Sequence, residues 1–119
     1  MRLHHLALRT RALDRLEAFY VGLLGLTVIS RSARGVWLEA GGTIVMLENA
    51  DTTEPAPDAS SMELVCFAIA PNDRAARERA LENAAVALES ATEFTLYFRD
   101  PDGRRVGLSH HPDPPISRA

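Results

Sequence analysis

The order of structural elements that the sequence predicts occurs twice along the chain. Each copy begins with a short apolar segment, Leu3–Thr10 in the first and Glu63–Ala70 in the second, followed by a helical segment and further strand-like segments. A repeat of this kind constrains the fold more than any single motif, because each copy must form the same supersecondary unit. The sequence therefore predicts an α+β fold made of two βαβββ modules.

In the first copy, leucines at steps of three and four residues predict a helix over Ala12–Leu24, which Gly25 ends. Glycines at Gly35 and at Gly41–Gly42 predict the turns between the strands that follow. Those strands are expected at Leu26–Arg31, Val36–Glu39 and Thr43–Glu48.

The second copy follows a polar segment, Asn49–Ser61, that contains two prolines. Asn72 or Asp73 is expected to cap a helix with a mostly alanine face, because short polar side chains accept the first backbone N–H groups. An edge strand near Val86–Leu88, a strand at Phe94–Phe98, a turn at Asp100–Gly103 and a strand at Arg105–Ser109 complete the copy. We therefore expect one domain over residues 1–111, with module one at 2–49, a linker at 50–61, module two at 62–111 and a flexible tail at 112–119.

Composition excludes several functions. All 13 basic residues are arginine, so chemistry that depends on a lysine amine is excluded, and the net charge of -3 argues against nucleic-acid binding. The single cysteine, Cys66, has apolar neighbours and is predicted to be a core residue in a reducing compartment. No run of about 18 apolar residues indicates a membrane helix. We expect a cytoplasmic protein with no membrane partner.

Two local signatures and the opening strand carry a family resemblance. Residues 19–26 read FYVGLLGL, residues 100–108 read DPDGRRVGL, and the first strand contains HHLAL. With these motifs in this order, the chain resembles the vicinal-oxygen-chelate superfamily, which includes glyoxalase I, fosfomycin and bleomycin resistance proteins, and extradiol dioxygenases. The resemblance covers about residues 2–111. It implies that the modules form an open, cup-shaped mixed sheet with helices outside, and that two chains pair as a homodimer.

The resemblance also implies where metal ligands would lie. Metal-dependent members hold a divalent ion with a histidine on the first strand and a carboxylate on the last strand of each module. Those four positions fall on His5, Met46, Leu64 and Gly107. Only the histidine is a ligand that such ions prefer, so no cofactor is expected. A divalent metal remains possible through a relocated site at His5, Glu48 and His111, although His110 and His111 are more simply interpreted as a solvated pair.

Strand alternation indicates which side chains face the cup. His5 and Glu48 are predicted to orient a ligand, and Trp37 and Tyr97 are predicted to stack on it. The preferred interpretation is a protein that binds a small organic molecule without metal. The alternatives are a metal-dependent lyase, transferase or dioxygenase with a relocated site, an acid/base enzyme without metal, and an accessory role.

Overall fold

The structure, a computed structural model, describes residues 1–115. The chain divides into two compact units, the first covering Met1–Ala56 and the second beginning at Pro57. Part of the predicted tail, residues 116–119, lies outside the described residues. No helix among the described residues is long and apolar enough to cross a membrane.

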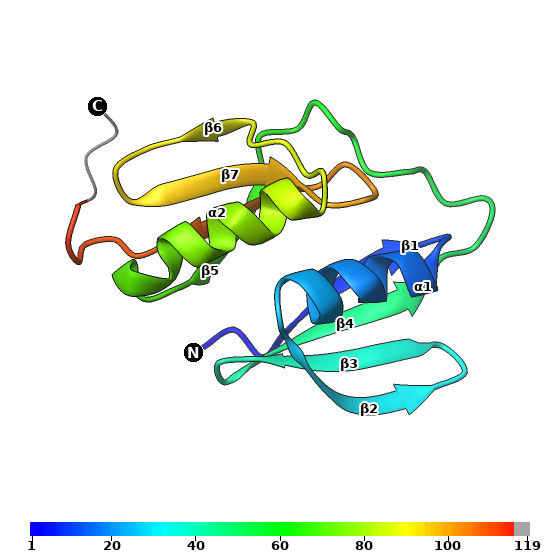
Figure 1. Cartoon of the computed structure of the whole chain (residues 1–119). Helices are drawn as coiled ribbons and strands as arrows, with labels where there is room; N and C mark the ends of the chain where they lie inside the picture. The colour runs from blue at the N-terminus through cyan, green and yellow to red at the C-terminus, as the bar shows by residue number, and fades with distance from the viewer. Residues whose placement is uncertain (116–119) are drawn as a thin grey trace. The chain divides into compact units, whose positions relative to one another are not determined.

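Unit 1 is a four-stranded sheet with one helical segment (Figure 1). The strand order is β1-β4-β3-β2, in which β1 and β4 run parallel and the other pairs are antiparallel. The elements are β1 (His5–Thr10), α1 (Leu13–Glu17), a π-helical segment η1 (Ala18–Leu23), β2 (Thr27–Ser32), β3 (Gly35–Ala40) and β4 (Thr43–Asn49).

The core of unit 1 lies between α1–η1 and one face of the sheet. Leu8, Leu38 and Leu47 are buried on that face, and Leu16 and Tyr20 of the helical segment are buried as well. Because successive side chains of a strand point to opposite faces, this leaves the second face of the sheet to the intervening residues.

Glycine has two different roles in unit 1. Gly41 and Gly42 have φ values of 58° and 92° and form the predicted turn between β3 and β4. The prediction of a turn at Gly35 is wrong: the turn lies at Ala33 and Arg34, and Gly35 is a buried residue of β3. A Cβ at Gly35 would lie 1.9 Å from the carbonyl oxygen of Leu47, so close approach of the two strands requires glycine there.

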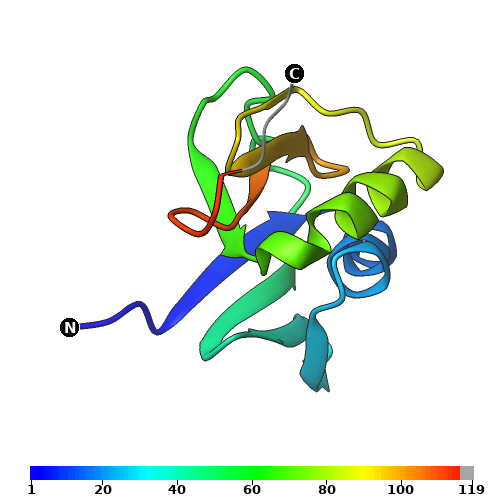
Figure 2. The ribbon, with the colours of Figure 1, turned by 60° about the vertical axis from the view of Figure 1, so that its left-hand side comes forward.

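Unit 2 repeats the same topology. Its strand order is β5-β8-β7-β6, with β5 and β8 parallel and the other pairs antiparallel. The elements are β5 (Leu64–Ala68), a 3-10 turn η2 (Pro71–Asp73), α2 (Arg74–Asn83), β6 (Ser90–Ala91), β7 (Thr95–Arg99) and β8 (Arg105–Ser109). The predicted α+β class and the two βαβββ modules are therefore confirmed. In each unit the helix lies over one face of its sheet (Figures 1 and 2).

The helix of unit 2 differs from its prediction in two ways. Asp73 makes no side-chain capping hydrogen bond, because the 3-10 turn η2 precedes the helix and leaves Asp73 in a helical conformation. The buried residues are Arg74 and Leu81, whereas Ala76 and Ala84 of the expected alanine face are exposed. Arg74 donates to the carbonyl of Thr92 at 2.7 Å, so a polar contact holds α2 in place together with the buried side chain of Leu81.

The end of α2 moves the edge strand away from its predicted place. Ala85 has a φ of 58°, its N–H donates to the carbonyl of Glu82, and the N–H of Val86 donates to the carbonyl of Leu81. These bonds form a Schellman motif with alanine where glycine is usual. The chain leaves the helix through residues 86–88 without pairing, so the edge strand forms at Ser90–Ala91 and not at the predicted Val86–Leu88.

Candidate functional site

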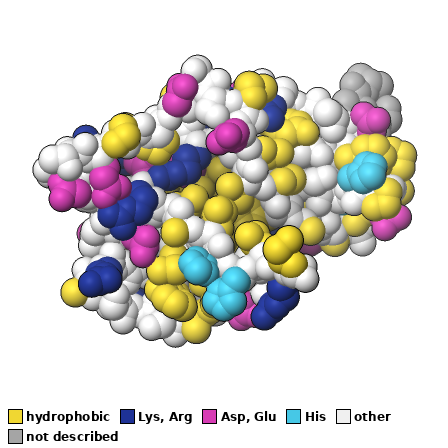
Figure 3. All heavy atoms as spheres, turned by 180° about the vertical axis from the view of Figure 1, so that it is seen from behind, with side chains coloured by type: hydrophobic (Ala, Val, Ile, Leu, Met, Phe, Trp, Pro, Cys, Tyr) yellow, Lys and Arg dark blue, Asp and Glu magenta, His cyan; other side chains and the backbone are white. Residues whose placement is uncertain are grey.

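The first sheet has a face that its own helix does not cover. We call it the first open face. It is formed by alternate residues of β1, β3 and β4: His5, Ala7, Arg9, Trp37, Glu39, Met46 and Glu48. Three of the four predicted ligand-binding residues, His5, Trp37 and Glu48, lie on this face. The surface seen from behind shows apolar side chains with arginines, acidic residues and histidines beside them (Figure 3).

Trp37 lies at the centre of the first open face. It pairs with Met46 across β3 and β4, and Met46 pairs with Ala7 across β4 and β1. This row of an indole, a thioether and a methyl group forms an apolar strip. Trp37 is 38% exposed, whereas tryptophan is highly buried on average. The strip therefore offers a flat aromatic surface to a ligand.

His5 lies one row further along the same face. It pairs with Ile44, which pairs with Glu39 on the next strand. The Nδ1 atom of His5 lies 2.9 Å from Nδ1 of the neighbouring His4, and both side chains are exposed. His5 is therefore accessible, and its ring orientation is influenced by His4.

Glu48 is occupied by an arginine network. Arg9 contacts Glu48 at 3.3 Å and holds Glu54 through its Nε and Nη2 atoms at 3.1 and 2.5 Å. The hydrogen bonds from Arg9, together with the backbone N–H of Asp51, lower the pKa of Glu54 to about 2. Glu48 therefore shares a guanidinium with a second carboxylate and is not an isolated counter-charge for a cationic ligand.

The register of β1 and β4 keeps His5 and Glu48 apart. Glu48 pairs with Arg9, and His5 is four residues before Arg9 on the same strand. Four residues of strand span roughly 13 Å, whereas ligand atoms lie about 2.0 to 2.2 Å from a metal ion. Unit 1 therefore does not bring the two residues to one ion.

Unit 2 presents a corresponding surface, which we call the second open face. It is formed by Leu64, Cys66, Tyr97, Arg99, Arg105, Gly107 and Ser109. The fourth predicted ligand-binding residue, Tyr97, lies here. The guanidinium carbon of Arg105 lies 4.2 Å from the centre of the Tyr97 ring, so one side of the ring is in contact with a cation.

Arg99, Arg105 and Glu89 form a cluster at the edge of the second open face that sequence reasoning missed. Glu89 accepts hydrogen bonds from Nε of Arg99 at 2.5 Å and from Nε of Arg105 at 3.0 Å. The two arginines flank the Asp100–Gly103 turn, and hairpin pairing across that turn places them directly opposite each other. This symmetry about the turn was the available sequence signal.

Cys66 is not a core residue, contrary to the prediction. It lies on the second open face and is exposed. Its apolar neighbours in sequence face both sides of β5, so they do not show that the thiol itself is in the core. Partial burial of the thiol nevertheless raises the pKa of Cys66, which favours the protonated, less reactive form.

The two C-terminal histidines have different environments. His111 is exposed, and its ring lies 4.8 Å from that of Phe94. The prediction that His110 is solvated is wrong: it is only 4% exposed, and its Nδ1 lies 2.7 Å from the carbonyl of Asp113. Nε2 of His110 lies 3.5 Å from Nη1 of the buried Arg74, so this histidine belongs to the polar contacts that hold α2.

Three of the four positions where the family resemblance predicts metal ligands, Met46, Leu64 and Gly107, carry side chains that divalent ions do not prefer. Met46 and Leu64 present a thioether and a methyl group, neither of which suits zinc, iron or manganese. A Cβ at Gly107 would lie 3.0 Å from Sγ of Cys66 and 3.4 Å from Cδ1 of Leu64, so neighbouring side chains crowd the place of a carboxylate. Among the described residues, no three His, Cys, Asp or Glu side chains form a group that could hold a metal.

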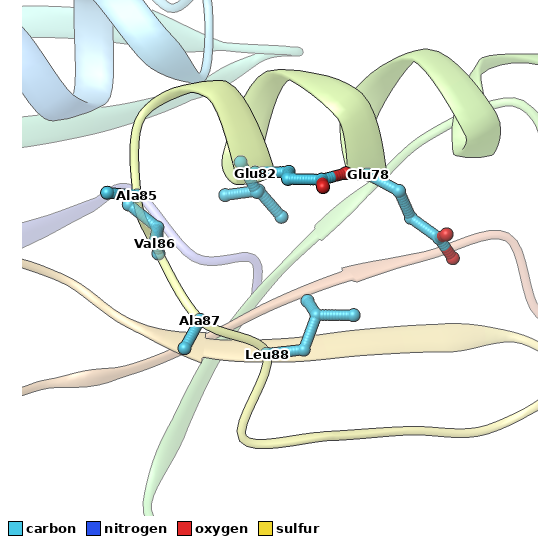
Figure 4. Close-up of a pocket in the computed structure, with 7 residues that line it drawn as sticks. Glu78, Glu82, Ala85, Val86, Ala87 and Leu88 are labelled. Carbon is cyan, nitrogen blue, oxygen red and sulfur yellow. The ribbon is translucent and has the colours of Figure 1, made fainter.

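A groove in unit 2 lies apart from all the predicted site residues. It has a volume of about 430 Å³ between the end of α2 and residues 85–88 (Figure 4). It is lined by the apolar residues Leu81, Val86 and Leu88 and by the acidic residues Glu78 and Glu82. Sequence analysis did not indicate this groove, because it depends on how the chain leaves the helix.

Comparison with known proteins identifies the family. The model of the Glyoxalase/Bleomycin resistance protein/Dioxygenase superfamily matches residues 2–108. The chain is 30% identical over 110 residues to the glutathione transferase FosA of Serratia marcescens, covering 89% of this chain and 78% of that protein.

Solved structures share the fold. A glyoxalase/dioxygenase from Nostoc punctiforme superposes with a TM-score of 0.81 at 20% identity, covering 94% of this chain and 92% of that chain. The E126Q mutant of the fosfomycin resistance protein FosX from Listeria monocytogenes, solved with Mn(II) and 1S,2S-dihydroxypropylphosphonic acid, superposes with a TM-score of 0.76 at 15% identity, covering 92% and 91%. The chain belongs to the Glyoxalase/Bleomycin resistance protein/Dioxygenase superfamily.

Proposed function

We propose that this protein binds a small organic molecule on its open faces without a resident metal ion. The observation that carries the proposal is the apolar strip of Ala7, Met46 and Trp37, where a thioether stands at a position that the family resemblance predicts for a metal ligand and an exposed indole lies beside it. A flat apolar surface with a few polar groups nearby is typical of small-molecule sites. In this role Trp37 stacks on the ligand, and His5 donates or accepts a hydrogen bond at one end of the strip.

The crowding at Gly107 supports the same proposal. Both Gly107 and Leu64 would have to change before unit 2 could supply a histidine and a carboxylate. The contact between Tyr97 and Arg105 keeps a second aromatic ring in a fixed position on the other open face. The proposal includes a homodimer and a cytoplasmic location, which follow from the family resemblance and the composition.

Fluorescence of Trp37 tests the proposal, because it is the only tryptophan in the chain. Titration of the full chain with 2-naphthol is expected to give saturable quenching. The Ala7→Gln variant, which places a longer side chain on the strip, is expected to weaken the quenching at least tenfold. Ala18→Gln adds the same atoms at an exposed position on the helical segment and serves as the matched control. Equal quenching in both variants would contradict a site on this face.

A second candidate is a divalent-metal-dependent lyase, transferase or dioxygenase with a relocated site. It is favoured by the 30% identity to a glutathione transferase, and its candidate ligands are His5, Glu48 and His111. Metal analysis of the protein purified after supplementation with manganese, zinc or iron separates the two candidates. About one bound ion per chain, lost in His5→Ala, would establish the metal-dependent protein and overturn the metal-free proposal. Absence of bound metal is the result expected from the residues at the ligand positions.

A further inference from the structure

Two arginines lie directly opposite each other on the second open face. Arg99 of β7 pairs with Arg105 of β8. Like charges at directly opposed positions destabilise a sheet, so such a pair needs a compensating group. Glu89 is that group, and it binds the Nε atom of each arginine. These hydrogen bonds, first that from Arg99, lower the pKa of Glu89 and keep it ionised. Two positive charges and one negative charge leave these three residues with one net positive charge, and the carboxylate of Asp58 also interacts electrostatically with Arg99.

Compensation by Glu89 leaves several guanidinium donors unused. Nη1 of Arg99 donates to the carbonyls of Ser61 and Gly103 at 2.8 and 3.2 Å, which fixes that side chain. Within residues 1–115, no hydrogen-bond partner is found for Nη2 of Arg99 or for either Nη atom of Arg105. None of these atoms is buried without a partner, so they are accessible.

The cluster is held rigidly for a surface feature. The side chain of Arg105 is 13% exposed and that of Arg99 is 22% exposed. The Tyr97 ring supports the guanidinium of Arg105, and Glu89 fixes its Nε atom. A guanidinium fixed in this way loses little conformational entropy when it binds an anion, and its paired N–H groups match two oxygens of an oxyanion.

Apolar surface adjoins the cluster on the same face. Leu64 pairs with Arg105 across β5 and β8 and is 39% exposed. We propose that Arg105 and Arg99 bind the oxyanion group, a carboxylate, phosphate or phosphonate, of a small organic ligand whose apolar part lies against Leu64. This inference rests on the proposed small-molecule function and adds the charge class of the ligand and the residues that recognise it.

Calorimetric titration of the full chain with matched aromatic probes tests the inference. Benzoate and phenylphosphonate carry the oxyanion, and benzyl alcohol is a neutral compound of similar size. We expect both anions to bind at least tenfold more tightly than benzyl alcohol. Tighter binding of benzoate would indicate preference for a planar carboxylate, and tighter binding of phenylphosphonate would indicate preference for a tetrahedral oxyanion. Arg105→Gln is expected to weaken benzoate binding at least tenfold, or about 1.4 kcal/mol. Arg79→Gln removes the same charge from an exposed position of α2 and should leave the affinity unchanged.

The Glu89→Gln variant distinguishes a loss of anion binding from a loss of folding in the arginine variant. It removes the compensating negative charge while retaining a hydrogen-bond acceptor, so benzoate affinity should rise in the anion-binding model. Unchanged benzoate affinity in Arg105→Gln, or equal affinity for benzyl alcohol and benzoate, would overturn anion recognition while leaving small-molecule binding intact. Failure of every probe to bind, together with absence of Trp37 quenching, would overturn both the inference and the proposed function.

Discussion

The end of α2 allows a prediction of stability from a single backbone angle. Ala85 has a φ of 58°, a left-handed conformation that costs an L residue roughly 1–2 kcal/mol. Glycine adopts this conformation without that cost. It also gives the unfolded chain more conformational freedom, which reduces the gain in stability by about 0.4–1 kcal/mol. Ala85→Gly is therefore expected to raise the free energy of unfolding by about 0.5–1 kcal/mol. For a chain of this size, that is an increase in melting temperature of roughly 2–4 °C.

The matched control is the same substitution inside the helix. Ala80 lies within α2, where glycine costs about 1 kcal/mol relative to alanine, so Ala80→Gly should lower the melting temperature by roughly 4 °C. Both residues belong to unit 2, so both variants report on the same transition. Thermal and urea denaturation followed by circular dichroism measure the two changes. A decrease in stability for Ala85→Gly would refute the reasoning, because relief of the left-handed conformation would then not be the dominant effect.

Three further predictions concern other parts of the chain. Gly35→Ala would place a Cβ 1.9 Å from a backbone carbonyl oxygen, so it should lower the free energy of unfolding, measured by urea denaturation, by more than about 3 kcal/mol. A Cβ at Gly22 would meet nothing within 4 Å, so Gly22→Ala should be tolerated. Similar stabilities of the two variants would contradict the close approach of the strands at Gly35. The hydrogen bonds and ion pair with Arg9 lower the pKa of Glu54 to about 2. The original protein should therefore be more stable than Glu54→Gln by its full margin above about pH 4.3, and this margin should disappear as the pH falls through 2. A difference in melting temperature that does not change with pH would argue against the ion pair. Because burial raises the pKa of Cys66, iodoacetamide should alkylate it more slowly at pH 8 than it alkylates glutathione; faster alkylation would contradict this.

The repeat was predictable because the alternation of apolar and polar residues along each strand follows from which face of the sheet is buried. The predicted strand Arg105–Ser109 matches β8 at both ends, and the glycine pair at residues 41–42 forms its predicted turn. Gly35 was misinterpreted because its role depends on the strand β4, whose Glu48 pairs with it from thirteen residues away. Sequence proximity cannot distinguish a glycine needed for a turn from one needed for close packing.

The sheet faces on which the candidate residues lie were also predictable from the sequence. Alternation placed Trp37 and Tyr97 on their open faces, because it depends only on residue parity. The environments of His110 and Glu48 depend on long-range contacts with Arg74 and Arg9, which no local pattern indicates. The partners of charged and polar side chains could therefore be identified only from the structure, whereas the face on which a strand residue lies could be predicted from the sequence.

The parallel pairing of first and last strands has a consequence for the order of folding. In each unit the first strand can join its sheet only after the last strand is in place, because in the described sheets β1 pairs with β4 alone and β5 pairs with β8 alone. The antiparallel strands β2, β3 and β4 close short loops, whereas the β1–β4 ladder closes a loop of about forty residues and carries a greater entropic cost. We expect β1 to join late and to detach first, so its amide protons should exchange with solvent faster than those of β3. Local opening would then carry both His5 and Ala7 away from Met46 and Trp37, which lie on the strands that stay paired.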